Sequence, residues 1–193
     1  MDSKKLQWVD TKMNDLDANE KLVGGIVMVA RQGKVAHFGT YGLRDREKNL
    51  PMEQDTIFRI YSMTKAITSV AALMLEEEGK LNLNDSISKY FPSLKKMKVL
   101  GRSGLIEPKR EVTVADLLRH TSGLTYAWSS QKEIREAHRD AGVLNRGTKL
   151  VPMVHGMSKI PLVFHPGSDW VYGCSTDVLG GVVEVASGMP FDK

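Results

Sequence analysis

One stretch of the sequence decides the fold: residues 58–79, FRIYSMTKAITSVAALMLEEEG. Apolar side chains recur there three and four positions apart, which predicts an α-helix. The apolar positions cover more than half of the helix circumference, so we expect a central, buried helix that ends at Gly79. Ser62 lies in the first turn of this helix, and Lys65 follows three residues later on the same face.

A serine and a lysine at this spacing can form a nucleophile and its base. The spacing occurs four times, at Ser62/Lys65, Ser86/Lys89, Ser93/Lys96 and Ser129/Lys132. A lysine acts as a base only where its ammonium form is disfavoured. Only Lys65 heads an apolar helix, where burial and the positive end of the helix dipole both favour the neutral amine. The competing interpretation makes Ser62 a helix cap and Lys65 a surface residue.

The segment before residue 58 predicts a helix and a hairpin. Apolar residues at spacings of three and four indicate an amphipathic helix over residues 6–16. Residues 23–30 and 35–41 are rich in β-branched side chains and flank the turn sequence RQGK, which predicts two antiparallel strands. The polar residues 44–55 are expected to form a connecting loop.

After residue 79, helical signals dominate. Thr113 and Asp116 form a predicted capping box that opens a short helix, which Gly123 closes. Further helices are expected over residues 132–140 and 176–186. The basic stretch 95–110 is expected to be a solvated loop, because it lacks the interleaved aromatic residues that bind nucleic-acid bases.

Composition excludes several classes of protein. With 193 residues, 41% hydrophobic and 26% charged, the chain is expected to be one globular domain in water, and no apolar run is long enough to span a membrane. A lone cysteine, Cys174, and the absence of an export signal favour the cytoplasm. Four histidines show no metal-ligand spacing, so no metal or organic cofactor is expected: His37, His138, His155 and His165.

Three segments together resemble one family. They are FRIYSMTK at residues 58–65, LLRHTSGL at residues 117–124, and PGSDWVY at residues 166–172. The chain resembles the serine β-lactamase-like hydrolases, which include class C β-lactamases, D-alanyl-D-alanine peptidases and the family VIII carboxylesterases. The resemblance implies an α/β fold of the α+β type, with an antiparallel sheet flanked by helices and a helical subdomain. It also implies a single domain, 1–193, with an N-terminal helix and hairpin (1–60), a mainly helical region carrying the nucleophile (61–172) and a returning helix (173–193).

The resemblance also implies roles for three catalytic residues. Ser62 would attack a carbonyl carbon, and Tyr172 would act as general acid and base. Lys65 would accept the serine proton or keep Tyr172 ionised, and the backbone amide of Ser62 would donate to the oxyanion. His120 is an alternative base, but the resemblance assigns its turn a structural role. Tyr172 as an ordinary core aromatic is the other alternative.

Two departures from the family pattern shape the predicted function. Cys174 stands where the β-lactam enzymes have asparagine in Tyr-x-Asn, which favours ester substrates; a buried, inert thiol is expected rather than a nucleophile. The chain also ends at Lys193, without the family's later strand bearing Lys-Thr-Gly or its equivalents. We therefore expect an incomplete domain with an unpaired sheet edge at residues 23–41, completed by a missing C-terminal segment or a second chain, and poor activity of the isolated chain.

The sequence thus predicts a serine hydrolase of small carboxylic esters. β-Lactamase and D-amino-acid peptidase activities are the enzymatic alternatives. A catalytically inactive relative that binds ligands or partners is the alternative from another class. We expect no nucleic-acid or membrane partner.

Overall fold

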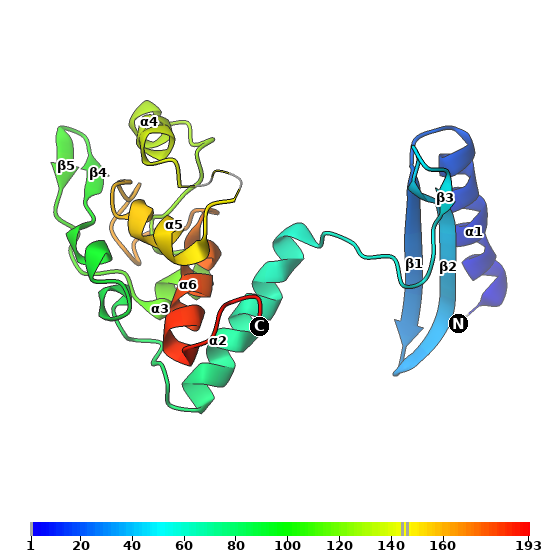
Figure 1. The fold of residues 1–193 in the computed structure, drawn as a ribbon, viewed down its shortest axis with the longest axis horizontal. Helices are drawn as coiled ribbons and strands as arrows, with labels where there is room; N and C mark the ends of the chain where they lie inside the picture. Colours follow the sequence, from blue (N-terminus) through cyan, green and yellow to red (C-terminus); the bar gives the residue numbers. More distant parts are fainter. Residues whose placement is uncertain (1, 144, 146) are drawn as a thin grey trace. The chain divides into compact units, whose positions relative to one another are not determined.

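The computed structural model describes residues 2–143, 145 and 147–193, and divides into two compact units. The first unit ends at Arg59 and the second begins at Ile60 (Figure 1). All three predicted catalytic residues belong to the second unit.

The first unit is a helix lying against a small antiparallel sheet (Figure 1). Helix α1, Ser3–Ala18, begins after Asp2, whose carboxylate accepts from the Lys4 amide at 2.9 Å. Strands β1, Gly24–Arg31, and β2, Lys34–Asp45, form the predicted hairpin. The predicted helix and hairpin are therefore confirmed.

The turn of this hairpin explains its register. Gln32 and Gly33 both have positive φ, 51° and 72°, as a two-residue type I′ turn requires. The expectation of a loop over residues 44–55 is wrong in part, because β2 runs on to Asp45 and pairs with a short strand β3, Leu50–Pro51. Among the described residues β1 pairs with β2 alone, which leaves its other edge unpaired.

The second unit is mainly helical (Figure 1). Its α-helices are α2, Thr64–Glu77; α3, Val114–Arg119; α4, Lys132–Ala141; α5, Leu150–Met157; and α6, Ser175–Ser187. Three short 3₁₀ turns are η1, Tyr61–Met63; η2, Ile87–Lys89; and η3, Pro92–Lys96. One hairpin joins β4, Val99–Gly101, to β5, Gly104–Ile106.

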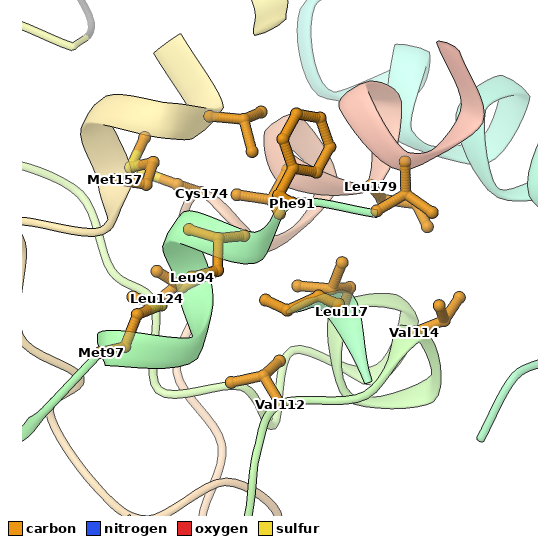
Figure 2. Packing of buried hydrophobic residues seen from close by; sticks show 14 of the residues in the cluster. Phe91, Leu94, Met97, Val112, Val114, Leu117, Leu124, Met157, Cys174 and Leu179 are labelled. Carbon is orange, nitrogen blue, oxygen red and sulfur yellow. The ribbon is translucent and has the colours of Figure 1, made fainter. Parts of the chain in front are cut away.

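The core of this unit lies between α6 and the elements that surround it. Phe91, Leu117 and Leu179 are almost fully buried there, together with Cys174 (Figure 2). Helix α6 packs against α2, α3 and α5. Gly180 and Gly181, in the middle of α6, let neighbouring side chains pack closely against the helix. A β-carbon at Gly181 would collide with Val154 and press on Phe91. The core thus fixes α6, and with it the segment that precedes α6.

The expectation that α2 is buried around most of its circumference is wrong for this unit. Its buried residues are Thr68, Ala72 and Leu75, whereas Ile67 and Met74 are 65% and 54% exposed. Helical periodicity shows which positions are apolar but not what covers them. The predicted end of the helix is confirmed, since Gly79 has a φ of 69°.

Two further expectations need correction, and one helix was missed. The stretch 95–110 is not a solvated loop, because β4 and β5 pair there and Val99 is buried. Helix α3 opens on the predicted capping box but ends earlier than Gly123, at Arg119, with His120 in the left-handed conformation. Helix α5 was not predicted. Among the described residues, no helix combines the length and apolar character needed to cross a membrane.

Candidate active site

The backbone around Ser62 is strained. Ser62 lies in the middle of η1, one turn ahead of α2, rather than inside the first turn of the long helix as expected. Tyr61 directly before it has a φ of 45°, a conformation that costs free energy for a residue with a β-carbon. Such strain is concentrated at functional sites, and here it accompanies an exposed Ser62 side chain.

Ser62 and Tyr172 lie in direct contact, although 110 positions separate them. The Ser62 Oγ and Tyr172 Oη atoms are 2.6 Å apart, and either hydroxyl can donate. The hydrogen bonds from Ser62 and from Lys65 lower the pKa of Tyr172, and they outweigh the opposing effect of burial. Tyr172 is therefore closer to a phenolate than an ordinary tyrosine, which is what a base for the serine hydroxyl requires.

Lys65 completes the predicted trio, and of the two roles expected for it, the charged one fits its surroundings; the neutral amine favoured by its helix position does not. Its Nζ lies 4.9 Å from the centre of the Tyr172 ring. Burial lowers the pKa of Lys65, yet hydrogen bonds to Tyr172 and Tyr126 raise it above the ordinary value overall. The expected neutral amine is thus replaced by an ammonium group, because two phenol oxygens lie within its reach. A charged Lys65 supports the phenolate form of Tyr172.

Tight backbone packing holds Tyr172 in place. The Val171 amide donates to the His120 carbonyl at 3.1 Å. At Gly173 a β-carbon would collide with the carbonyl oxygen of Leu124 and the α-carbon of Thr125, so only glycine fits. Figure 2 shows the next residue, Cys174, among the core side chains.

Cys174 fastens this segment from inside the core. The side chain is fully buried, and its Sγ donates to the Thr125 carbonyl at 3.1 Å. Burial raises the pKa of the thiol, as does the nearby negative charge of Asp177. The thiol is thus a buried group bonded to the Thr125 carbonyl, and its raised pKa agrees with the inert role that was expected.

Two members of the site were not predicted, Tyr126 and Asp177. Lys65 Nζ donates to Tyr126 Oη at 3.4 Å, and Tyr126 Oη donates to Asp177 Oδ2 at 3.3 Å. Tyr126 follows the LLRHTSGL segment after one threonine, and Asp177 lies five residues after Tyr172, in the first turn of α6. No spacing rule connects these positions with Lys65, because Asp177 reaches it through the packing of α2 on α6, and Tyr126 reaches it from the loop after α3.

His120 contacts the site through its ring and not through a hydrogen bond to Ser62. The imidazole packs on Tyr172 with ring centres 5.1 Å apart, and on Trp170 at 6.2 Å. Burial lowers its pKa, and the charge of Lys65 adds to this effect. A neutral, packed imidazole supports Tyr172 sterically, in keeping with the structural role that the resemblance implied.

The other three serine and lysine pairs lack this arrangement. Lys89 forms an ion pair with Asp85 at 2.7 Å, and Lys132 is 73% exposed. Lys96 is also exposed, in η3. None of these lysines contacts a tyrosine hydroxyl among the described hydrogen bonds. Among the described residues, only the pair Ser62/Lys65 forms hydrogen bonds with tyrosine hydroxyls, those of Tyr172 and Tyr126.

Comparison with known proteins identifies the family of the chain. Residues 9–193 match the family model described as Beta-lactamase. The chain belongs to the Beta-lactamase family. It is 37% identical over 173 residues to esterase EstB of Burkholderia gladioli, an alignment that covers 88% of this chain and 42% of that protein.

Other relatives in this family are acyltransferases. The chain is 30% identical over 188 residues to monacolin J acid methylbutanoyltransferase of Aspergillus terreus, covering 89% of this chain and 44% of that protein. The structure of EstCE1, a hydrolase with promiscuous acyltransferase activity, matches with a TM-score of 0.80 at 28% identity, over 94% of this chain and 47% of that one. The chain thus spans less than half the length of these relatives and has the β-lactamase-like fold in incomplete form.

Proposed function

We propose that the protein hydrolyses small carboxylic esters through an acyl-enzyme formed on Ser62. The observation that carries this proposal is the 2.6 Å contact between Ser62 Oγ and Tyr172 Oη, beside the ammonium group of Lys65. A serine hydroxyl is a weak nucleophile until a base takes its proton. Tyr172 is the group placed to do so.

The first half of the reaction acylates the serine. Tyr172, as phenolate, takes the Oγ proton while Oγ bonds to the ester carbonyl carbon, and the electron pair of the carbonyl moves to its oxygen. The amide of Ser62 donates to that oxyanion. When the tetrahedral intermediate collapses, the bond to the alcohol oxygen breaks, and Tyr172 returns its proton to the leaving alkoxide.

The second half releases the acid. Tyr172, again a phenolate, removes a proton from water as the water oxygen attacks the acyl carbon. Collapse then breaks the bond to Ser62 Oγ, and Tyr172 gives the proton back to the serine. Lys65 keeps its proton throughout and stabilises the phenolate each time it forms.

Two observations favour an ester over a β-lactam. Cys174 replaces the asparagine of the β-lactam enzymes, and its side chain faces the Thr125 carbonyl inside the core instead of the nucleophile. The relatives reported above are named as an esterase, a hydrolase and an acyltransferase. β-Lactamase and D-amino-acid peptidase activities are correspondingly less favoured.

Acyl transfer to an alcohol is a second candidate, supported by the acyltransferase relatives. It shares the same acyl-enzyme, and it differs only in the acceptor that Tyr172 deprotonates. Product analysis with an added alcohol separates the two functions, because transfer yields a new ester in place of the free acid.

The test is acylation of the purified chain by short-chain p-nitrophenyl esters, compared with nitrocefin. We expect a burst of p-nitrophenol and a mass increase of one acyl group on Ser62, both absent in Ser62→Ala. Turnover after the burst should be slow, in keeping with the poor activity expected of the isolated chain. A fluorophosphonate probe provides an independent measure of the same nucleophile. Ser86→Ala is the matched control, and it should acylate as the unaltered chain does. Failure of folded protein to acylate, or faster turnover of nitrocefin than of esters, would refute the proposal.

A further inference from the structure

A polar chain continues from the catalytic trio into the interior of the second unit. It runs from Lys65 in α2 to Tyr126, and from Tyr126 to Asp177 in α6, over contacts of 3.4 and 3.3 Å. Lysine can only donate a hydrogen bond and carboxylate can only accept one. The Tyr126 hydroxyl therefore accepts from Lys65 and donates its own proton to Asp177, which requires Tyr126 to stay protonated.

The two tyrosines at this site have opposite environments. Burial and the charge of Asp177 raise the pKa of Tyr126 to about 12. The pKa of Tyr172 is lowered by its bonds to Ser62 and Lys65. Neighbouring groups whose pKa values are pushed apart take different roles. Tyr126 is the fixed donor, and Tyr172 is the group that exchanges a proton.

We propose that Asp177 and Tyr126 are positioning residues that hold Lys65 beside Tyr172 and set the charge of that pair. This inference rests on the proposed function. The Asp177 carboxylate attracts the Lys65 ammonium group, and the Tyr126 hydroxyl between them prevents a direct ion pair. Lys65 is thereby kept protonated and remains free to face Tyr172.

The groups that face Asp177 come from every element packed around it. They are Lys65 from α2, His120 at the end of α3, Tyr126 from the following loop, and Tyr172 and Cys174 from the segment before α6. Burial raises the pKa of Asp177 above its ordinary value overall, although Lys65 and Tyr126 oppose this effect. The lowered pKa of His120 disfavours its charged form, and the raised pKa of the Cys174 thiol keeps the thiol protonated. The charge that Asp177 balances is therefore that of Lys65.

This arrangement predicts a specific effect of Asp177→Asn. Without the negative charge of Asp177, the Lys65 ammonium group is less favoured and the Tyr172 phenolate is more favoured. The pKa of both groups therefore falls. The acid and alkaline limbs of the kcat/KM profile should both move to lower pH, by about half to one pH unit. A purely structural role would reduce activity at every pH without moving the limbs.

Tyr126→Phe is the second variant, because it keeps the ring that stacks on Trp128 at 4.3 Å but removes the hydroxyl. We expect kcat to fall roughly 10- to 100-fold, with KM nearly unchanged, since the hydroxyl bonds to Lys65 and Asp177 and would act on the reaction through Lys65. Asp140→Asn, at a carboxylate 70% exposed in α4, is the matched control and should change neither the profile nor kcat.

A readout independent of turnover separates this inference from the proposed function. Ultraviolet absorbance reports phenolate formation, and the difference between the chain and its Tyr172→Phe variant isolates Tyr172 among the five tyrosines. The same difference measured in the Asp177→Asn background should show Tyr172 ionising at lower pH. If the chain hydrolyses esters but Asp177→Asn leaves the Tyr172 titration or the limbs of the kcat/KM profile unchanged, the inference alone is overturned. A chain that titrates as expected but forms no acyl-enzyme would overturn only the proposed function.

Discussion

Replacement of Asp116 by asparagine should destabilise the second unit in a manner that depends on pH. The Asp116 carboxylate is fully buried in α3. It accepts hydrogen bonds from the Arg110 guanidinium, from Thr113 and from Thr121. Burial alone would raise the pKa of this group, but these donors lower it to about 2, from the model-peptide value of 3.8.

The size of the effect follows from linkage between protonation and folding. A carboxyl group whose pKa is lower in the folded state stabilises it above the unfolded pKa, and the contribution is lost as the pH falls through the folded value. A shift from 3.8 to about 2 corresponds to about 2.5 kcal/mol at pH 7. The same relation gives about 1.3 kcal/mol at pH 3 and about 0.4 kcal/mol at pH 2. Asparagine is neutral at every pH and lacks this contribution.

Urea unfolding followed by tryptophan fluorescence measures the difference. Trp8 belongs to the first unit, whereas Trp128 and Trp170 belong to the second, so a Trp8→Phe background reports the second unit alone. Asp192→Asn, at a carboxylate 76% exposed, is the control and should shift the free energy of unfolding by less than about 0.5 kcal/mol.

The decisive quantity is the change of this difference with pH. The gap in unfolding free energy between the unaltered chain and Asp116→Asn should shrink by about 2 kcal/mol between pH 7 and pH 2. A gap that stays constant over this range would show that the carboxylate charge contributes nothing, and would refute the reasoning from the Arg110 pair.

Three further predictions follow from the packing and the site. Phe91→Ala should lower the free energy of unfolding by about 3–5 kcal/mol, because this ring is 1% exposed in the core; a loss below about 1 kcal/mol in urea unfolding would contradict that packing. Gly173→Ala should destabilise the second unit by roughly 1–3 kcal/mol and slow acylation, because the added β-carbon collides with the Leu124 carbonyl. Gly79→Ala is the control for the collision, since nothing lies near the added carbon there. Equal acylation rates in the two variants would contradict the role of the collision. The acid limb of ester turnover should have a midpoint below pH 10, since the pKa of Tyr172 is lowered; a midpoint at or above 10 would exclude Tyr172 as the base.

Local features of the fold were accessible from the sequence. The hairpin followed from β-branched runs around RQGK, and α3 and α6 followed from a capping box and a terminal glycine. These signals are local, since each depends on residues within one or two turns of chain. Helix α5 and the β4–β5 hairpin were missed because these elements are short, and the burial of their apolar residues depends on partners far away in the sequence.

The charge of Lys65 shows why a site is harder to predict than its residues. The helix position suggested a desolvated, neutral amine. The structure adds two phenol oxygens, from Tyr172 and Tyr126, and these reverse the direction of the pKa shift. Both tyrosines are more than sixty positions away, so no pattern in the helix itself records them.

The sequence by itself determined the nucleophile candidate and its partners: Ser62 and Lys65 at a helical spacing, and Tyr172 within a motif that resembled one family, which the comparisons then confirmed. Only the tertiary structure decided how these residues are used. The packing of α2 on α6 brings Asp177 near Lys65, the loop after α3 brings Tyr126 between them, and the contact of Gly173 with Leu124 fixes Tyr172. The reason is physical: periodicity and spacing act within one element, whereas charge and proton transfer depend on groups that only folding brings within a few ångströms.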